Sequence, residues 1–199
     1  TMERAFALAF ALANHRHTGH KRKNSEIPYI SHLMAVSALV LEYGGTLTQA
    51  SAALLHDVIE DTDCTIDEVI ELVGDEVAQI VLACTHEPSE DKTPEGWKKR
   101  KQHYLDHLLD PKRESKANLV ALCDKAHNIE CTVRDWHASG HDQSKMFVGF
   151  NAGWDLQLWW YNSLADAFDR EGREVSQELA ALCNKSNRFG GGRVKHSKV

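Results

Sequence analysis

The sequence contains few residues that would break helices or cross-link the chain. Only 4 of its 199 residues are proline and 12 are glycine, which excludes collagen-like and broadly disordered chains. Its apolar runs fall far short of the roughly 20 residues that a membrane-spanning helix needs, so we expect no contact with a membrane. The first residues show no charged region followed by an apolar run, so we expect no signal peptide. The length predicts one domain with a sizeable core.

Cysteine is also sparse, and its five positions form no CxxC pair. An odd number of scattered cysteines in apolar, helical contexts indicates free thiols rather than a disulfide framework. The cysteines therefore predict a reducing compartment, the cytoplasm. The five positions are Cys64, Cys84, Cys123, Cys131 and Cys183.

The charge is slightly acidic overall, with 23 basic and 29 acidic residues and a net charge of −6. Five basic residues and no acidic one lie in the Gly-rich stretch 185–199. We therefore expect a folded domain over residues 1–184 and a flexible basic tail over 185–199. An acidic body argues against nucleic acid as the main partner, although the tail leaves RNA binding open as an alternative.

Helical signals run through nearly the whole chain, and alternating strand patterns with turn dipeptides are absent. The pattern predicts a single all-α bundle of about seven to ten helices. Thr48 is expected to cap a helix reaching Ile59, and residues 65–68 match a capping box that starts a short helix. Further helices are expected over 143–170 and 174–184.

One expected helix ends with an imidazole and three carboxylates. His56 and Asp57 follow the apolar run 52–55, and Glu60 and Asp61 come three and four residues after Asp57. Helical spacing places Glu60 on the face that carries the first pair. Carboxylates packed so closely repel one another unless a cation lies among them.

Two further residues complete a plausible ligand set for a metal. His32 begins the preceding helix, and Asp124 ends another apolar helical run. With His56 and Asp57 they offer two nitrogens and two oxygens, a mixture that suits Mn²⁺, Fe²⁺ or Zn²⁺ with positions left open for water. Because a His-Asp pair within a helix is common, the prediction depends on the joint pattern of all four residues.

Three segments resemble the RelA/SpoT branch of the HD-domain phosphohydrolases. They are Ile27-Pro-Tyr-Ile-Ser-His32, Ala53-Leu-Leu-His-Asp-Val-Ile-Glu-Asp-Thr62 and Asp124-Lys-Ala-His-Asn128. An upstream basic pair, Arg22-Lys23, also resembles the family. The likeness covers roughly residues 5–168, which leaves no room for the synthetase and regulatory domains of the long enzymes. The chain therefore resembles a stand-alone, small alarmone hydrolase of the Mesh type.

The resemblance implies a reaction and a role for each site residue. His32, His56, Asp57 and Asp124 would hold Mn²⁺, while Glu60 and Asp61 would orient water and move protons. The implied reaction removes the 3′-diphosphate of a guanosine or adenosine alarmone as pyrophosphate. Substrate would be bound by Arg22, Lys23, Lys125 and Asn128. The sequence departs from the family at Glu130, where an Arg is usual, so the base preference stays open.

The sequence is also compatible with other functions. The protein could be an HD nucleotidase for other nucleotides, a nucleotide sensor without turnover, or an interaction module that binds RNA through its tail. His15, His17 and His20 form a cluster better explained as polar surface on the substrate side than as a second metal site. His103 and His107 lack the Glu of a zincin helix. The basic run 98–101 is expected to form a solvated face, with contact to substrate phosphates as the alternative. A group of aromatic residues is expected in the core, with a homodimer contact as the alternative: Trp154, Trp159, Trp160 and Tyr161.

Overall fold

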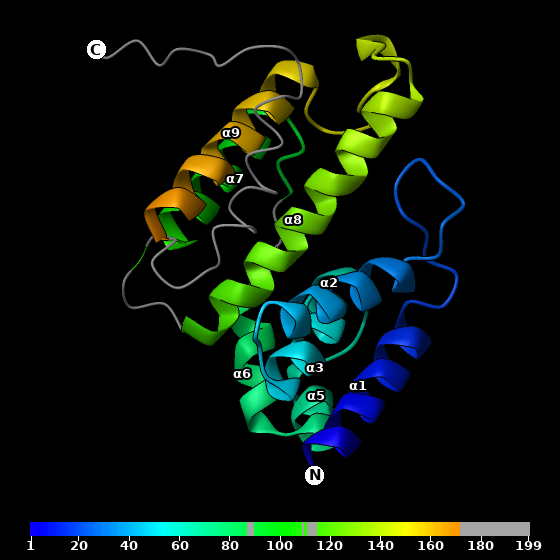
Figure 1. Cartoon of the computed structure of the whole chain (residues 1–199), viewed down its shortest axis with the longest axis vertical. Coiled ribbons are helices and arrows are strands. Elements are labelled where there is room, and N and C mark those ends of the chain that lie inside the picture. Colours follow the sequence, from blue (N-terminus) through cyan, green and yellow to red (C-terminus); the bar gives the residue numbers. More distant parts are fainter. Residues whose placement is uncertain (87–89, 109, 111–114, 172–199) are drawn as a thin grey trace. The chain divides into compact units, whose positions relative to one another are not determined.

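The computed structural model describes residues 1–86, 90–108, 110 and 115–171, and these residues are predominantly helical (Figure 1). In this part of the chain the only β pairing is an isolated antiparallel bridge between Lys21 and Pro28. The elements are α1 (Met2–Arg16), α2 (Ile30–Glu42), α3 (Leu47–Leu55), α4 (Val58–Asp61), α5 (Ile66–Val73), α6 (Asp75–Cys84), α7 (Pro94–Leu108), α8 (Ser115–Ala138), a 3-10 turn (Gln143–Lys145) and α9 (Trp154–Glu171). The predicted all-α class is confirmed. No described helix is both long enough and apolar enough to cross a bilayer.

Capping boxes start two of the helices. The side chain of Thr65 accepts from the backbone N–H of Glu68, and the Glu68 side chain accepts in return from Thr65, as the sequence predicted. The cap of α3 is Thr46, paired with Gln49, so the prediction of Thr48 was wrong. Thr46 takes this place because its backbone is extended, with φ −85° and ψ 164°, the conformation that an N-cap requires.

The helix expected to run to Ile59 is interrupted. It ends at Leu55, and a turn at His56 and Asp57 leads into the short α4. The two chemically important residues therefore lie in a turn and not in a continuous helix.

The single helix expected over 143–170 was also wrong in its first part. The 3-10 turn is followed by irregular backbone, with positive φ at Phe147 (56°) and Gly149 (72°). A side chain at φ 56° does not fit a right-handed helix, so α9 begins only at Trp154. The expected helix over 174–184 and the expected domain boundary and tail from residue 185 lie outside the described residues.

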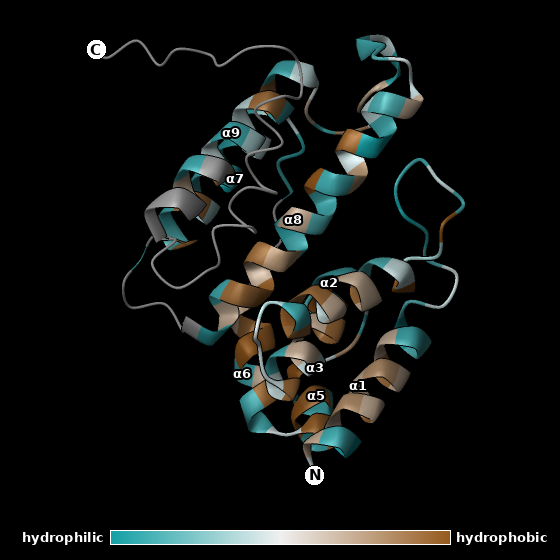
Figure 2. Ribbon diagram, viewed as in Figure 1, coloured by the Kyte–Doolittle hydropathy of each residue, from teal (hydrophilic) through white to brown (hydrophobic). Residues whose placement is uncertain are grey.

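The chain divides into two compact units. Among the described residues, the first comprises 1–86, 90, 110 and 115–127, and the second comprises 91–108 and 128–171. Within the first unit α3 packs against α1, α2 and α6. Figure 2 shows apolar residues along α2, α3, α5 and α6. The large side chains that are fully buried there include Leu33, Leu54, Leu55, Ile80 and Leu122.

The second unit has an aromatic core. The Trp160 ring lies 5.5 Å from the Tyr104 ring and 6.4 Å from the Trp97 ring, and all three side chains are buried. The predicted core role of Trp160 is confirmed. Two lysines of the basic run lie over tryptophan rings of this unit, since Lys101 Nζ lies 4.6 Å from the Trp160 ring and Lys98 Nζ lies 5.2 Å from the ring of the neighbouring Trp159. This part of the run is therefore held against aromatic faces.

The cysteines of the described residues are free thiols. Cys64, Cys84 and Cys123 are buried, and Cys131 is half-buried. This agrees with the expectation from their spacing.

Candidate metal centre

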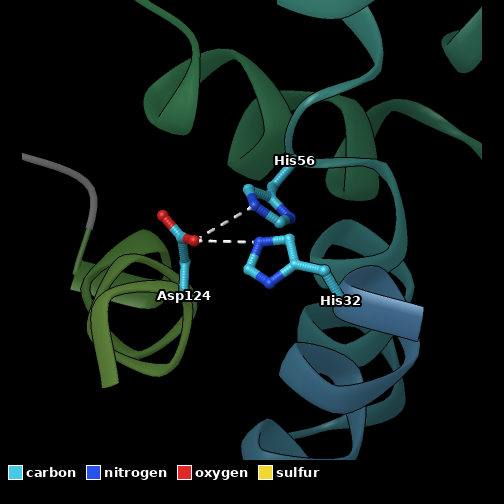
Figure 3. Close-up of side chains that lie close together, drawn as sticks. All are labelled: His32, His56 and Asp124. Atoms are coloured by element: carbon cyan, nitrogen blue, oxygen red, sulfur yellow. Dashed lines mark ion pairs between the residues drawn. The ribbon is translucent and has the colours of Figure 1, made fainter. Parts of the chain in front are cut away.

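Four residues from three segments that are far apart in the sequence converge in the first unit. His32 comes from α2, His56 and Asp57 from the turn after α3, and Asp124 from α8. Asp124 Oδ1 lies 3.1 Å from His32 Nε2 and 3.6 Å from His56 Nε2 (Figure 3). Asp57 Oδ2 lies 3.0 Å from His56 Nε2 and 3.9 Å from His32 Nε2. The structure thus brings together all four residues that the sequence proposed as ligands.

The imidazole of His56 is oriented by the helix that it follows. Its Nδ1 lies 2.7 Å from the backbone oxygen of Ala53, which can only accept, so Nδ1 carries the proton. Its Nε2 is fully buried and makes no hydrogen bond of regular geometry. A buried imidazole nitrogen that faces two carboxylates lies where a cation, either a proton or a metal ion, offsets their negative charge.

The imidazole of His32 is held from the side away from the carboxylates. Its side chain is 1% exposed, and its Nδ1 lies 2.7 Å from Nδ1 of His127. His127 lies three residues after Asp124 on α8. This helix therefore supplies one candidate ligand, Asp124, and also the residue that contacts a second candidate ligand, His32. Nothing in the sequence predicts this contact beyond the motif that contains His127.

Asp57 is oriented by a phenol. Tyr29 Oη donates to Asp57 Oδ2 over 2.6 Å. Burial, together with the carboxylates of Asp57 and Asp61, raises the pKa of Tyr29, so the phenol stays protonated and remains a donor. Tyr29 directly precedes α2, which places it within reach of the turn that carries Asp57.

The charges of the cluster are strongly coupled. Burial opposes ionisation, but the nearby carboxylates of Asp57 and Asp124 outweigh it and raise the pKa of His56 well above its usual value. Burial dominates at His32 and lowers its pKa. Despite burial, the neighbouring Lys125 and the histidines hold the pKa of Asp124 well below its usual range, and His56 does the same for Asp57. Both carboxylates are therefore anions near neutral pH.

The donor set fits a divalent cation. One ligand atom each from His32, His56 and Asp124 lies within 4.8 Å of the others, and a carboxylate oxygen of Asp57 lies beside both imidazoles. Two imidazoles and carboxylate oxygens are borderline and hard ligands of the kind that first-row divalent metals accept. The carboxylates are already anionic, as metal binding requires, whereas Nε2 of His56 must release the proton that its raised pKa favours before it can bind a metal.

The two acidic residues expected to act on water follow the cluster on α4. Glu60 contacts His86, whose backbone N–H donates to Glu60 Oε1 over 2.7 Å and whose ring Nδ1 lies 2.9 Å from the same oxygen. Partial desolvation and the negative charges of Asp57 and Glu60 raise the pKa of Asp61 to about 6. A carboxyl with such a pKa can accept and release a proton near neutral pH.

The four residues expected to bind substrate have different surroundings. The guanidinium carbon of Arg22 lies 5.8 Å from the centre of the Tyr29 ring, which links it to the metal cluster through one side chain. Lys125 Nζ forms an ion pair with Asp124 Oδ2. Lys23 is exposed in the loop before α2. Asn128 is half-buried and belongs to the second unit, one residue after His127 along α8.

One histidine of the cluster near the end of α1 packs against the ring of Tyr29. His17 is 3% exposed, and its ring stacks on Tyr29 at 5.1 Å. Its Nδ1 lies 3.2 Å from Nδ1 of His20. His17 therefore backs the tyrosine that orients Asp57. His103 and His107 are exposed on α7, as expected for a surface helix.

Comparison with known proteins agrees with this geometry. The model of the HD domain family matches residues 7–146. The zebrafish (Danio rerio) protein named guanosine-3′,5′-bis(diphosphate) 3′-pyrophosphohydrolase MESH1 is 36% identical over 136 residues, which cover 65% of this chain and 71% of the relative. The Escherichia coli bifunctional (p)ppGpp synthase/hydrolase SpoT is 32% identical over 123 residues, which cover 61% of this chain but only 17% of SpoT.

A solved structure has a similar fold over nearly its whole length. It is described as a metazoan orthologue of SpoT that hydrolyses ppGpp, and it is 25% identical with a TM-score of 0.71, covering 94% of this chain and 96% of that one. The chain belongs to the HD-domain family of hydrolases. Within that family it is a MESH1-like protein.

Proposed function

We propose that this protein hydrolyses the 3′-diphosphate of (p)ppGpp and releases pyrophosphate. The observation that carries the proposal is the convergence of His32, His56, Asp57 and Asp124 on one buried point. The names of the MESH1 relatives, which the chain matches over about 70% of their length, supply the substrate class. (p)ppApp is the alternative substrate of the same chemistry, because Glu130 leaves the base preference open.

The four ligands are proposed to hold Mn²⁺, with Fe²⁺ and Zn²⁺ as alternatives. Such an ion, when bound, polarises a phosphate oxygen and lowers the pKa of water. His56 and His32 present Nε2 toward that position, and Asp57 and Asp124 present one oxygen each. The ammonium of Lys125 offsets the second oxygen of Asp124.

The remaining roles follow from position and charge. Glu60 and Asp61 lie on the helix that follows the ligand turn, and we assign them the orientation of water and the transfer of its proton. Arg22 and Lys23, in the loop before α2, and Lys125 are assigned to the phosphates of the substrate, which need positive charge beside an otherwise acidic protein. Asn128 is assigned to the sugar or base through its amide.

The test uses purified protein freed of metal. ppGpp, pppGpp, ppApp and pppApp are each incubated with and without Mn²⁺, and products are resolved by anion exchange. We expect Mn²⁺-dependent formation of pyrophosphate and a nucleoside 5′-phosphate, and its loss in Asp57→Asn. Release of monophosphate instead would indicate a nucleotidase, while metal binding with all four substrates intact would indicate a sensor. Either result would overturn the proposal.

The free buried thiols support a further proposal, that the protein works in the reducing cytoplasm. Fractionation of cells with an antibody to the protein tests it. Recovery in an oxidising compartment would contradict it.

A further inference from the structure

We infer that His127 is a positioning residue that fixes His32 as a metal ligand, an inference that rests on the metal site of the proposed function. The two rings face each other with Nδ1 atoms 2.7 Å apart, ring centres 4.9 Å apart and an interplanar angle of 36°. A separation of 2.7 Å between two ring nitrogens requires that one of them donates a hydrogen bond to the other.

The direction of this hydrogen bond follows from the rest of the site. The nitrogen of His32 that faces the carboxylates is Nε2, at 3.1 Å from Asp124 Oδ1 and 3.9 Å from Asp57 Oδ2. To bind a cation, Nε2 needs its lone pair, so the single proton of a neutral His32 must lie on Nδ1. Nδ1 of His32 therefore donates, and Nδ1 of His127 accepts.

This assignment also fixes the state of His127. A ring nitrogen that accepts has no proton, so His127 must be neutral and carry its proton on Nε2. With the opposite direction, His32 would carry its proton on Nε2 and point it at Asp124, and could not act as a ligand. The direction of this hydrogen bond therefore determines whether His32 can act as a metal ligand.

The second imidazole of the site is oriented in a different way. His56 donates from Nδ1 to the backbone oxygen of Ala53 over 2.7 Å, and a carbonyl oxygen accepts in every protonation state. His32 depends instead on a side chain that substitution can remove. Outer partners of ligand histidines fix the tautomer and ring orientation, and their loss typically weakens metal affinity about 10–100-fold. The two histidines of one site thus differ in how their orientation is secured.

Substitution of His127 tests the inference, with Mn²⁺ alone as the probe. The Asn of His127→Asn can present its side-chain oxygen near the position of Nδ1, whereas the Leu of His127→Leu fills a similar volume without an acceptor. We expect titration calorimetry to show an Mn²⁺ affinity about 10–100-fold weaker for His127→Leu and close to wild type for His127→Asn. Equal affinities for wild type and His127→Leu, or equally weak affinities for both variants, would overturn the inference.

The tautomer of His32 can also be read in the wild-type protein, which keeps the inference testable if a variant fails to fold. Two-dimensional NMR of ¹⁵N-histidine-labelled protein with Zn²⁺, a diamagnetic ion, distinguishes a protonated Nδ1 from a protonated Nε2. We expect His32 to carry its proton on Nδ1 and His127 on Nε2; the reverse assignment would overturn the inference. Neither readout uses a nucleotide, so a protein that binds Mn²⁺ through these histidines but leaves alarmones intact would refute only the proposed function.

Discussion

His86 holds one oxygen of Glu60 through two contacts. The backbone N–H of His86 donates to Glu60 Oε1 over 2.7 Å, and its ring Nδ1 lies 2.9 Å from the same atom. Both contacts fall on Oε1, so Oε2 takes part in neither. A carboxylate fixed through one oxygen presents the other in a defined direction, as a general base requires.

Glu60→Gln should therefore lose turnover and keep metal binding. An amide cannot take a proton from water, so we expect kcat for ppGpp to fall by about 10²–10⁴-fold with an unchanged Mn²⁺ affinity. In His86→Ala the kcat should fall less, because the backbone N–H of residue 86 still donates to Glu60. Glu71→Gln, at an exposed position on α5, is the matched control. If Glu60→Gln lost its Mn²⁺ affinity, Glu60 would be a ligand instead of a base.

The hydrogen bond from Tyr29 to Asp57 predicts that loss of the phenol weakens the binding of metal. Tyr29→Phe keeps the ring that stacks on His17 but removes the donor to Asp57 Oδ2. We expect Mn²⁺ affinity to fall about 10–100-fold, with little change in the unfolding midpoint of the metal-free protein. Tyr43→Phe, at the other end of α2, provides the control. An unchanged affinity in Tyr29→Phe would show that Asp57 is oriented without the phenol.

The sequence was sufficient for the parts of the site that local patterns specify. His56, Asp57 and Asp124 each follow an apolar helical run, and a carboxylate or imidazole beside a buried face needs a partner. The capping box at Thr65 likewise depends on residues three apart, which one turn of helix brings together. These features involve short stretches of chain, where spacing and geometry are directly related.

The residues that orient the ligands could not be predicted in this way. His127 contacts His32 across 95 positions, Tyr29 contacts Asp57 across 28, and His86 contacts Glu60 across 26. Such pairs are set by how the helices pack, which no spacing along the sequence reveals. The helix expected over 143–170 was wrong in its first part for a different reason. Residues 143–153 have a helical pattern, but the backbone at Phe147 and Gly149 is left-handed, which the pattern does not reveal.

The helix caps predict a change in stability that leaves the site intact. Thr46→Ala removes the side-chain oxygen that accepts from Gln49 at the start of α3, and Thr65→Ala does the same for Glu68 at the start of α5. We expect each to lower the free energy of unfolding by about 0.5–2 kcal/mol in urea titrations. Because the folded state keeps its ligands, Mn²⁺ affinity at 25 °C should stay at the wild-type value in both. A weaker affinity in Thr46→Ala alone would mean that the cap of α3 also positions His56.

The raised pKa of Asp61 predicts how the stability of the metal-free protein depends on pH. Partial desolvation and the charges of Asp57 and Glu60 move this pKa from 3.8 to about 6. Between these two values the folded state holds a proton that the unfolded state has released, so this group lowers stability as the pH rises through that window. Its unfavourable contribution is absent near pH 4 and complete near pH 7.

Asp61→Asn isolates this contribution, because the other titrating groups are shared with the wild type. Denaturant unfolding in EDTA should give similar free energies for the two proteins at pH 4 and a more stable Asp61→Asn at pH 7, with the difference growing between pH 4 and 6. A bound divalent ion offsets the carboxylates around Asp61, so saturating Mn²⁺ should reduce the difference at pH 7. A difference that stays constant with pH would show that the neighbouring carboxylates do not act on Asp61, and its assignment as a proton acceptor near neutral pH would then lose its physical basis.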